Sequence, residues 1–167
     1  SIPAEIRYPQ HFHVRGMVAA AREGDEVNPQ KRSSQFQFYI VTGRHVTEEK
    51  LDAIDKDKTA TKVENRYRQK IIDNQQHINK LRQERKMAAL QNLLDKLYQQ
   101  AEEEQIEQEG LFFPENVIRA YKYNGGAPWL DGEYTVFGEV TEGMKVVSKI
   151  EKAKTNDKDE PLEDRKS

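Results

Sequence analysis

The pattern of apolar and polar residues divides the chain into three parts. Both ends carry short runs of β-branched, aromatic and small residues separated by Gly and Asp-Gly, a pattern typical of strands and turns. Between them, residues 45–109 contain neither Gly nor Pro and consist mainly of strong helix formers. The sequence therefore predicts β-structure at both ends, interrupted by a long helical segment.

Two apolar stripes run through this helical segment at helical spacing, and they are out of phase. The first contains Val63, Tyr67, Ile71, Ile78 and Leu81, and the second Met87, Leu90, Leu94, Leu97 and Ala101. One straight helix could not bury both stripes on one face, so we predict a break between Arg82 and Lys86 and a helical hairpin. Antiparallel packing would also bring the basic residues at 58–70 close to the acidic residues at 102–109.

Capping residues predict where the helices begin and end. Thr47, followed by two glutamates, predicts the start of a short helix, and Thr61 with Glu64 forms a capping box that predicts a second, longer one. Pro114 predicts the first turn of a further short helix. The run 124–126, Asn-Gly-Gly, would end that helix.

Composition excludes several kinds of chemistry. The chain has no cysteine, which excludes disulfides, thiolate catalysis and cysteine-based zinc sites. Its net charge of −2 gives no reason to expect nucleic acid or an anionic membrane as partner, and no stretch is apolar enough to span a bilayer. His11 and His13 would share one face of a strand, but two ligands make a poor metal site, so we interpret them as structural or surface residues. The basic run 80–86 reads as a solvated hairpin tip rather than a nucleic-acid patch.

The run Trp129-Leu130-Asp131-Gly132 is the most informative local pattern. Asp-Gly favours a tight turn, and residues 133–140 then continue as an extended stretch. A large aromatic residue and a leucine beside a turn suit the rim of an apolar pocket. The alternative is that Trp129 is simply a core residue.

Two upstream segments favour the pocket over that alternative. Residues 16–22 read Gly-Met-Val-Ala-Ala-Ala-Arg and residues 37–41 read Gln-Phe-Tyr-Ile-Val. Together with the Trp-Leu-Asp-Gly run, and in this order, they resemble the cyclophilins, the barrel-shaped peptidyl-prolyl cis-trans isomerases. The resemblance covers residues 1–44 and 127–167. It implies a β-plus-α fold: a partial cyclophilin-like antiparallel β-barrel interrupted by a helical insertion over residues 45–126.

The resemblance also implies a set of substrate-binding residues. Tyr39 stands where the family has the aromatic residue, usually Phe, at the base of the proline pocket. Arg22 stands where eukaryotic members commonly have Asn. The complete implied set is Ala21, Arg22, Gln37, Tyr39, Trp129, Leu130 and Tyr134. Gln35 remains an alternative to Gln37, because Ser34-Gln35-Phe36 also spells the family's Ser-Gln-Phe and a shift of two residues keeps the same strand face.

Prolyl isomerisation needs no cofactor, metal or nucleophile. Amide resonance sets a barrier of roughly 18–20 kcal/mol, and a site lowers it by holding proline in a dry slot and stabilising the twisted amide. In cyclophilins an arginine in a Phe-His-Arg segment acts on that amide, followed by a Met-x-Gln-Gly-Gly-Asp stretch. This sequence contains neither. We therefore expect a fragment that lacks the N-terminal half with the catalytic arginine and is inactive or impaired alone.

Three functional hypotheses follow. The first is a peptidyl-prolyl cis-trans isomerase that assists protein folding, acting on proline-containing peptides or unfolded clients. The second is a proline-peptide-binding or chaperone module without turnover. The third makes the helical insertion a partner-docking or dimerising element. Self-association or a complementing N-terminal segment would stabilise an incomplete barrel. The sequence leaves both cytoplasm and periplasm open as the compartment.

Overall fold

The structure is a computed structural model that describes residues 1–153, 155, 156 and 158. Its contacts divide the chain into two compact units. The sheet unit comprises Ser1–Glu48 and Glu115–Ser167, and the hairpin unit comprises Glu49–Pro114. Each unit is described by itself below.

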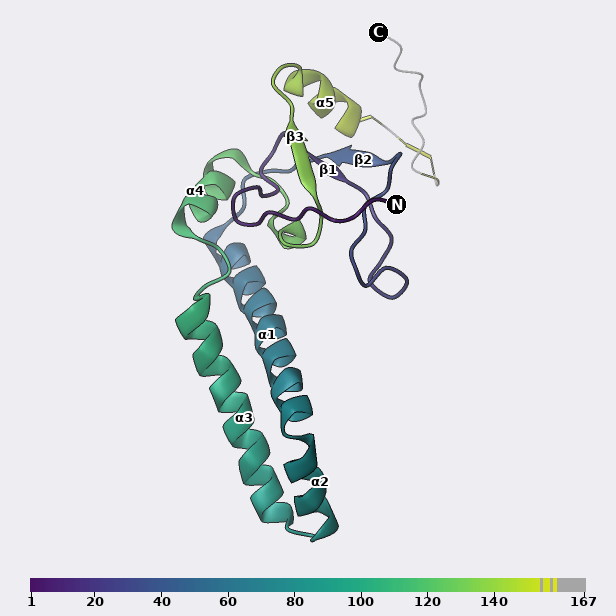
Figure 1. Ribbon diagram of the computed structural model, residues 1–167. Helices are drawn as coiled ribbons and strands as arrows, with labels where there is room; N and C mark the ends of the chain where they lie inside the picture. Colours follow the sequence, from purple (N-terminus) through teal and green to yellow (C-terminus); the bar gives the residue numbers. More distant parts are fainter. Residues whose placement is uncertain (154, 157, 159–167) are drawn as a thin grey trace. The chain divides into compact units, whose positions relative to one another are not determined.

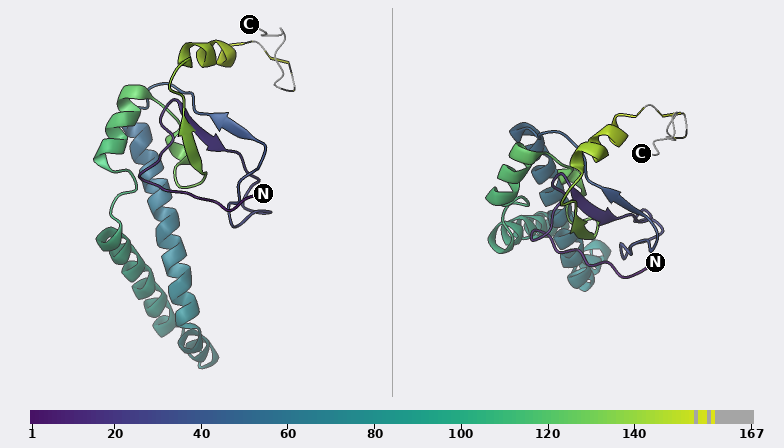
Figure 2. Two further views of the ribbon diagram at one scale, coloured as in Figure 1. Left: turned by 45° about the horizontal axis from the view of Figure 1, so that its top comes forward. Right: turned by 90° about the horizontal axis from the view of Figure 1, so that it is seen from above.

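The sheet unit is built on three short antiparallel strands (Figures 1 and 2). These are β1 (Met17–Ala20), β2 (Phe38–Ile40) and β3 (Val136–Glu139), in the order β2-β1-β3. Ala19 pairs with Tyr39 on one side and with Val136 on the other, and the register with β3 shifts between Val18 and Ala19. The mixed helix-and-sheet architecture is confirmed, and the strands that the structure describes form an open sheet.

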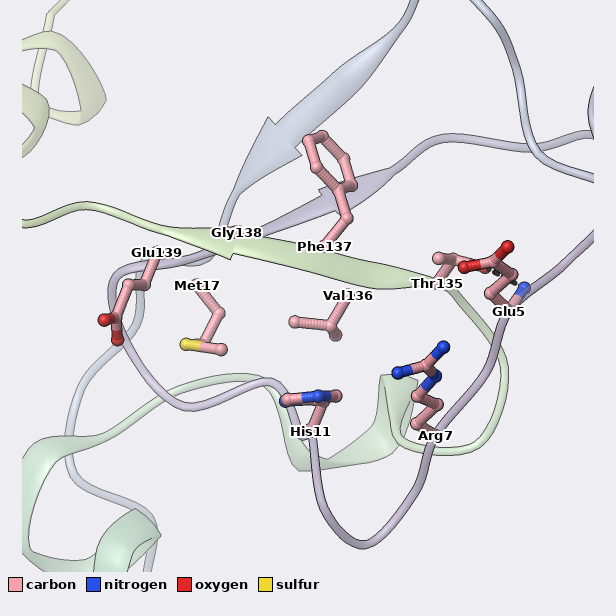
Figure 3. A pocket seen from close by; sticks show the side chains of 9 residues that line it. All are labelled: Glu5, Arg7, His11, Met17, Thr135, Val136, Phe137, Gly138 and Glu139. Carbon is pink, nitrogen blue, oxygen red and sulfur yellow. Dashed lines mark hydrogen bonds between the residues drawn. The ribbon is translucent and has the colours of Figure 1, made fainter.

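The two faces of this sheet differ strongly in exposure. Ala19 and Val136 are buried on one face. On the other, Phe38 and Phe137 are 63% and 61% exposed. Figure 3 shows Val136 and Phe137 pointing to opposite sides of β3. One face of the sheet therefore carries Ala19 and Val136 in the core, whereas the other exposes Phe38 and Phe137 but buries Ala20, the partner of Phe38.

Helix α4 (Glu115–Asn124) packs within the sheet unit. It follows Pro114 directly, as predicted, and its apolar side buries Val117 and Tyr121 completely. The Tyr121 ring meets Phe12 edge to face at 5.5 Å. The sequence grouped this helix with the insertion over residues 45–126, whereas these contacts place it in the same compact unit as the sheet.

Three glycines fix the place where α4 ends. Gly43, Gly125 and Gly126 all have positive φ. A Cβ on Gly126 would lie 2.3 Å from the carbonyl oxygen of His13, one on Gly125 would lie 2.4 Å from that of Arg44, and one on Gly43 would lie 2.8 Å from that of Gly126. Three backbone segments thus touch with no room for a side chain.

The hairpin unit is an antiparallel pair of helical arms (Figure 1). One arm consists of α1 (Glu48–Asp73) and α2 (Gln75–Gln83), and the other is α3 (Met87–Gln108). The break lies where the out-of-phase stripes predicted it, and Arg85 takes a φ of 56° there. Lys70 bonds Glu104 at 2.6 Å and Lys62 bonds Glu109, so the predicted antiparallel pairing of basic and acidic segments is confirmed. The hydrogen bond from Lys62 holds the pKa of Glu109 below its ordinary value.

Two predicted details of the first arm are wrong. Thr61 does not begin a helix, because α1 runs without interruption from Glu48 and the Thr61 hydroxyl donates instead to the carbonyl of Asp57 at 3.1 Å. The interruption falls at Asn74, whose side chain donates to the carbonyl of Lys70 at 2.8 Å, an oxygen that also accepts from the Asn74 backbone N–H at 3.0 Å. With no Gly or Pro nearby, the sequence marks the break only by this polar side chain.

The apolar stripes form the core of the hairpin. Near the tip, Ile78, Leu81 and Leu90 are buried against one another, with Ile71, Leu93 and Leu94 packed around them. Met87 is wrong as a member of the second stripe, because it is the first residue of α3 and is 60% exposed. Near the base, buried Asp55 accepts hydrogen bonds from the backbone N–H groups of Phe112 and Phe113 at 3.3 and 3.0 Å.

Two further helices complete the described chain. A 3₁₀ turn spans Pro128–Leu130, and α5 spans Met144–Glu151. Helix α5 buries no residue among those described, and its Val146 and Ile150 are 57% and 55% exposed. In the described part of the chain, every helix is too short or too polar to cross a membrane. Residues 159–167, which the resemblance assigned to the barrel, lie outside the described residues.

Candidate functional site

Three of the predicted site residues meet beside the sheet. Tyr39 on β2 and Tyr134, just before β3, place their rings edge to face at 5.7 Å and 87°. The guanidinium of Arg22, just after β1, lies 4.6 Å from the centre of the Tyr134 ring. Residues far apart in the sequence thus form one cluster of two aromatic rings and a cation.

Arg22 is held firmly in this cluster. Its Nε donates to the carbonyl of Glu133 at 2.7 Å and its Nη1 to Asp25 at 2.7 Å, and its side chain is only 6% exposed. Lys31 bonds both Asp25 and Glu133, and its hydrogen bond lowers the pKa of Asp25. Burial opposes the charge on Lys31, but its hydrogen bonds to the two carboxylates raise its pKa overall. The side chain of Arg22 is therefore committed to protein contacts.

Ala21 and Gln37 meet through their backbones. The N–H of Ala21 donates to the carbonyl of Gln37 at 3.0 Å, and the carbonyl of Ala21 accepts from the N–H of Ser34 at 2.8 Å. The Gln37 residue is exposed. Both backbone groups of Ala21 are thus engaged within the sheet unit, and its carbonyl retains one further lone pair with which to accept from a peptide.

A cleft of about 510 Å³ opens next to this cluster. Arg22, Gln37 and Gln35 all line it, as does Phe36, which is 88% exposed. Both candidate glutamines thus border the same cleft, so their positions do not decide whether Gln35 or Gln37 corresponds to the family's substrate-binding glutamine.

Trp129 and Leu130 lie in the 3₁₀ turn before Asp131. The N–H of Leu130 donates to the carbonyl of Ala127, and its carbonyl accepts from the N–H of Glu133, each at 3.1 Å. Trp129 is 48% exposed. The alternative that Trp129 is a core residue is therefore wrong, because the turn presents its ring to solvent.

Sequence reasoning missed a buried polar network at this site. His13, Asp131 and Tyr121 are each at most 1% exposed. Asp131 Oδ1 lies 2.8 Å from the backbone nitrogen of His13 and 3.0 Å from its Nδ1, while Oδ2 accepts from the Tyr121 hydroxyl at 2.5 Å. His13 Nε2 lies 2.8 Å from the Tyr39 hydroxyl. No local pattern links residues this far apart in sequence, so only the fold could reveal the network.

Two of these tyrosines have strongly perturbed pKa values. Burial, followed by the charges of Tyr134 and Asp131, raises the pKa of Tyr39. Burial and the charge of Asp131 also raise the pKa of Tyr121. Both hydroxyls therefore remain protonated, and able to donate hydrogen bonds, across the neutral range.

A second cleft, of about 370 Å³, lies between the N-terminal segment and β3 (Figure 3). Met17 and Val136 form its apolar part, with Arg7 and His11 beside them. None of the predicted site residues lines this cleft. His11 thus faces a different space from His13, and the described residues hold no group of three or more His, Cys, Asp or Glu suited to a metal ion.

Comparison with known proteins gives a partial match. Residues 115–166 match the family model of the cyclophilin type peptidyl-prolyl cis-trans isomerase/CLD. Proteins named "putative peptidyl-prolyl cis-trans isomerase" from Staphylococcus saprophyticus and Staphylococcus haemolyticus are each 42% identical over 52 residues, which is 31% of this chain and 26% of theirs. The protein of that name from Staphylococcus aureus USA300 is 38% identical over the same length. No solved structure matches.

The match confirms the resemblance to the cyclophilins over this segment. It includes Trp129, Leu130 and Tyr134, whereas Ala21, Arg22, Gln37 and Tyr39 precede it. The matched part spans about a quarter of the length of the relatives.

Proposed function

We propose that this chain binds proline-containing peptides as part of a cyclophilin-type peptidyl-prolyl cis-trans isomerase that assists protein folding. One observation carries the proposal. The family match contains the turn with Trp129 and Leu130, and the fold brings Tyr39 and Arg22, from outside the match, to Tyr134 inside it. Two independent parts of the family pattern thus converge on one place.

The chemistry of this place suits a prolyl peptide. The Trp129 and Leu130 turn and the Tyr39 ring would supply apolar surface for the proline ring. Gln37 and Gln35, on the adjacent cleft, would supply amide hydrogen bonds to the flanking peptide. An apolar wall with a few polar groups is what orients a small substrate.

We propose that this chain alone binds such peptides and turns them over slowly or not at all. Stabilising the twisted amide calls for a cation that can donate to the prolyl nitrogen. Arg22, the cation at the rings, is already hydrogen-bonded to Glu133 and Asp25 and is largely buried. The sequence has no Phe-His-Arg segment that would provide another. Binding without turnover is therefore the alternative form of this function.

We also propose that residues 1–44 and 127–167 are one portion of a cyclophilin-like barrel, and that residues 45–126 are inserted into it in sequence, with α4 of that insertion belonging to the sheet unit. The exposed Phe38 and Phe137 support this, because they give the open sheet an apolar face of the kind that a barrel encloses. A complementing segment, corresponding to the part of the relatives beyond the match, would cover it. If Phe38→Ser lowers the molecular mass measured by light scattering, a second copy of this chain covers the face instead.

A binding and turnover experiment tests the proposal. Fluorescence polarisation of a labelled tetrapeptide with a central proline should show saturable binding, and the same peptide with alanine in place of proline should bind more weakly. Trp129→Ala should weaken binding of the proline peptide, whereas Phe112→Ala, in the hairpin unit, should not. Equal binding of the two peptides would contradict the proposal. Isomerisation at the rate of a complete cyclophilin would contradict only the proposal that this chain alone turns peptides over slowly or not at all.

The hairpin unit supports a second candidate function, as a partner-docking element. A shallow groove of about 670 Å³ runs along it, lined by Tyr67, Leu94 and Tyr98. The two tyrosine rings meet edge to face at 5.3 Å, and Tyr98 is 39% exposed. If Tyr98→Ser abolishes dimerisation or client capture while proline-peptide binding persists, the hairpin carries that function.

A further inference from the structure

A buried hydrogen-bond chain connects the two sides of the proposed pocket. Tyr39 lies on β2, whereas Trp129 and Leu130 lie in the turn that leads directly into Asp131. Between them stands His13, from the loop that precedes β1. It contacts Tyr39 through Nε2 at 2.8 Å and Asp131 through Nδ1 at 3.0 Å. His13 is thus the link between both walls.

The direction of each hydrogen bond follows from Asp131. A carboxylate can only accept, so the hydroxyl of Tyr121, the backbone N–H of His13 and His13 Nδ1 all donate to it. With the proton on Nδ1, the Nε2 of neutral His13 carries a lone pair. In this neutral tautomer the Tyr39 hydroxyl donates to Nε2.

This arrangement fixes the ring of Tyr39 in three ways. Its hydroxyl is bonded to His13, the His13 and Tyr39 rings lie nearly parallel at 6.0 Å and 15°, and Tyr134 meets both rings edge to face, at 5.7 Å from Tyr39 and 6.2 Å from His13. The family residue at this place is usually Phe, which has no hydroxyl and needs no such partner. In this chain, loss of His13 would leave a half-buried hydroxyl unpaired, and the ring would turn toward water.

We propose that His13 is a positioning residue that, anchored by Asp131, holds the Tyr39 ring at the base of the proline pocket and ties it to the Trp129 turn. This inference rests on the proposed function, since it assigns Tyr39 to substrate contact. His13 itself touches no substrate: it is 1% exposed. Its effect is to lower the cost of ordering the pocket when a peptide binds.

A double-mutant cycle tests the coupling. Tyr39→Phe and His13→Asn are each expected to weaken binding of the labelled proline peptide by roughly threefold to tenfold, which corresponds to the loss of one hydrogen bond. The double variant should bind the peptide with the same affinity as the single variant that binds it less tightly, because both changes remove the same interaction. His11→Asn, two positions away and facing the second cleft, is the matched control and should bind as the unchanged protein does.

A spectroscopic measurement tests the same contact without peptide binding. It also remains usable if the His13→Asn variant does not fold. In ¹⁵N NMR of the unchanged protein, His13 should show a protonated Nδ1 and a hydrogen-bonded, unprotonated Nε2. Tyr39→Phe should shift the Nε2 resonance and leave Nδ1 in place, and the resonances of His11 should not move. Additive losses in the cycle, or an Nε2 resonance unchanged by Tyr39→Phe, would overturn the inference.

The two proposals fail in different ways. If the unchanged protein binds no proline peptide, the proposed function fails, and the NMR result still decides whether His13 holds Tyr39. If the unchanged protein binds the peptide and Tyr39→Phe binds it equally well, the positioning role fails and the proposed function stands.

Discussion

Asp131 has two structural roles, one in a backbone turn and one as a buried hydrogen-bond acceptor, and its neighbours in the sequence indicate only the first. The Asp-Gly pair at 131 and 132 predicted a turn, and the backbone makes one, with the N–H of Glu133 donating to the carbonyl of Leu130 at 3.1 Å. The carboxylate, however, is buried and accepts from Tyr121 and His13. Turn preference is a local property of the backbone, whereas this second role depends on residues that only the fold brings near.

Replacing Asp131 should therefore destabilise the sheet unit severely. Asp131→Ala removes the buried carboxylate that accepts from the Tyr121 hydroxyl and from two N–H donors of His13, so we expect a loss of about 3 kcal/mol or more in unfolding free energy. Urea unfolding followed by the fluorescence of Trp129, the only tryptophan, measures it. Asp25→Ala, which removes an exposed carboxylate, is the control, and its expected loss of stability is much smaller. Similar losses for both variants would contradict the role of Asp131.

The raised pKa values of Tyr39 and Tyr121 predict how stability depends on alkaline pH. The unfolded chain loses these phenolic protons near the ordinary pKa of 10.0, whereas the folded protein retains them. Their contribution to stability is thus complete below pH 10 and is lost as pH rises above it. Absorbance titration at the tyrosinate band should show these two among the seven tyrosines ionising only with unfolding. Tyr39→Phe should weaken the pH dependence, whereas Tyr123→Phe, an 80% exposed residue, should not.

The site residues illustrate what sequence reasoning could supply. Family motifs placed Tyr39, Tyr134 and Arg22 in one expected pocket, and the structure brings these three together. Their roles as substrate contacts stay a prediction. The ion pairs that bury Arg22 were not predicted, because Asp25, Lys31 and Glu133 are ordinary surface residues in the sequence and become partners only through loop geometry.

At the scale of elements, the hairpin was the easiest part to predict. Two stripes out of phase cannot share one helix face, and the chain turns between them as that argument requires. The errors concern single polar residues. Thr61 and Asn74 can each bond the backbone within a helix or at its end, and the sequence does not say which each will do.

The tip of the hairpin should depend on Leu90. This residue is 5% exposed and packs against Ile78 and Leu81, so Leu90→Ala should cost about 2–5 kcal/mol of hairpin stability through lost burial and a residual cavity. Circular dichroism at 222 nm during urea unfolding is the measurement. Met87→Ala, at the exposed first residue of the same helix, should change stability by less than about 1 kcal/mol. A larger effect at Met87 than at Leu90 would contradict this packing.

At the scale of the whole molecule, the chain leaves the sheet unit and returns to it near a set of internal contacts. Glu48, its last residue before the hairpin, pairs with Lys122 of α4 at 3.0 Å, and the N–H of Val46 reaches the carbonyl of Tyr121 at 3.4 Å. All four residues belong to the sheet unit. These contacts hold together the two chain segments that lead into and out of the hairpin, and they involve no residue of the hairpin unit.

Removal of the hairpin should therefore leave the sheet unit folded. Replacing residues 49–114 with a short Gly/Ser linker should preserve the near-ultraviolet signal of Trp129 and the binding of the proline peptide. The same replacement combined with Lys122→Ala should be less stable, by an amount within about 1 kcal/mol for a surface pair. An unfolded deletion variant would mean that the hairpin is required for the sheet unit to fold.

The sheet was the hardest part to predict in full. Motifs identified the residues of all three strands, but short strands take their pairing and closure from partners distant in sequence. The barrel stays a prediction, and its closure would require segments that lie against Phe38 and Phe137. Local sequence patterns were enough to predict the mixed architecture, whereas they do not determine whether the sheet closes into a barrel.

The crossing of Gly43, Gly125 and Gly126 has a consequence for how this protein can vary over evolution. Each position excludes even a methyl group, and each sits next to residues that are free to change, such as exposed Arg44 and Asn124. A saturation library of this region, selected for folded protein, should therefore retain only glycine at three positions amid broadly tolerant neighbours. Such a sparse signature, three fixed glycines from two distant segments, would identify the same crossing in proteins too divergent for ordinary sequence comparison.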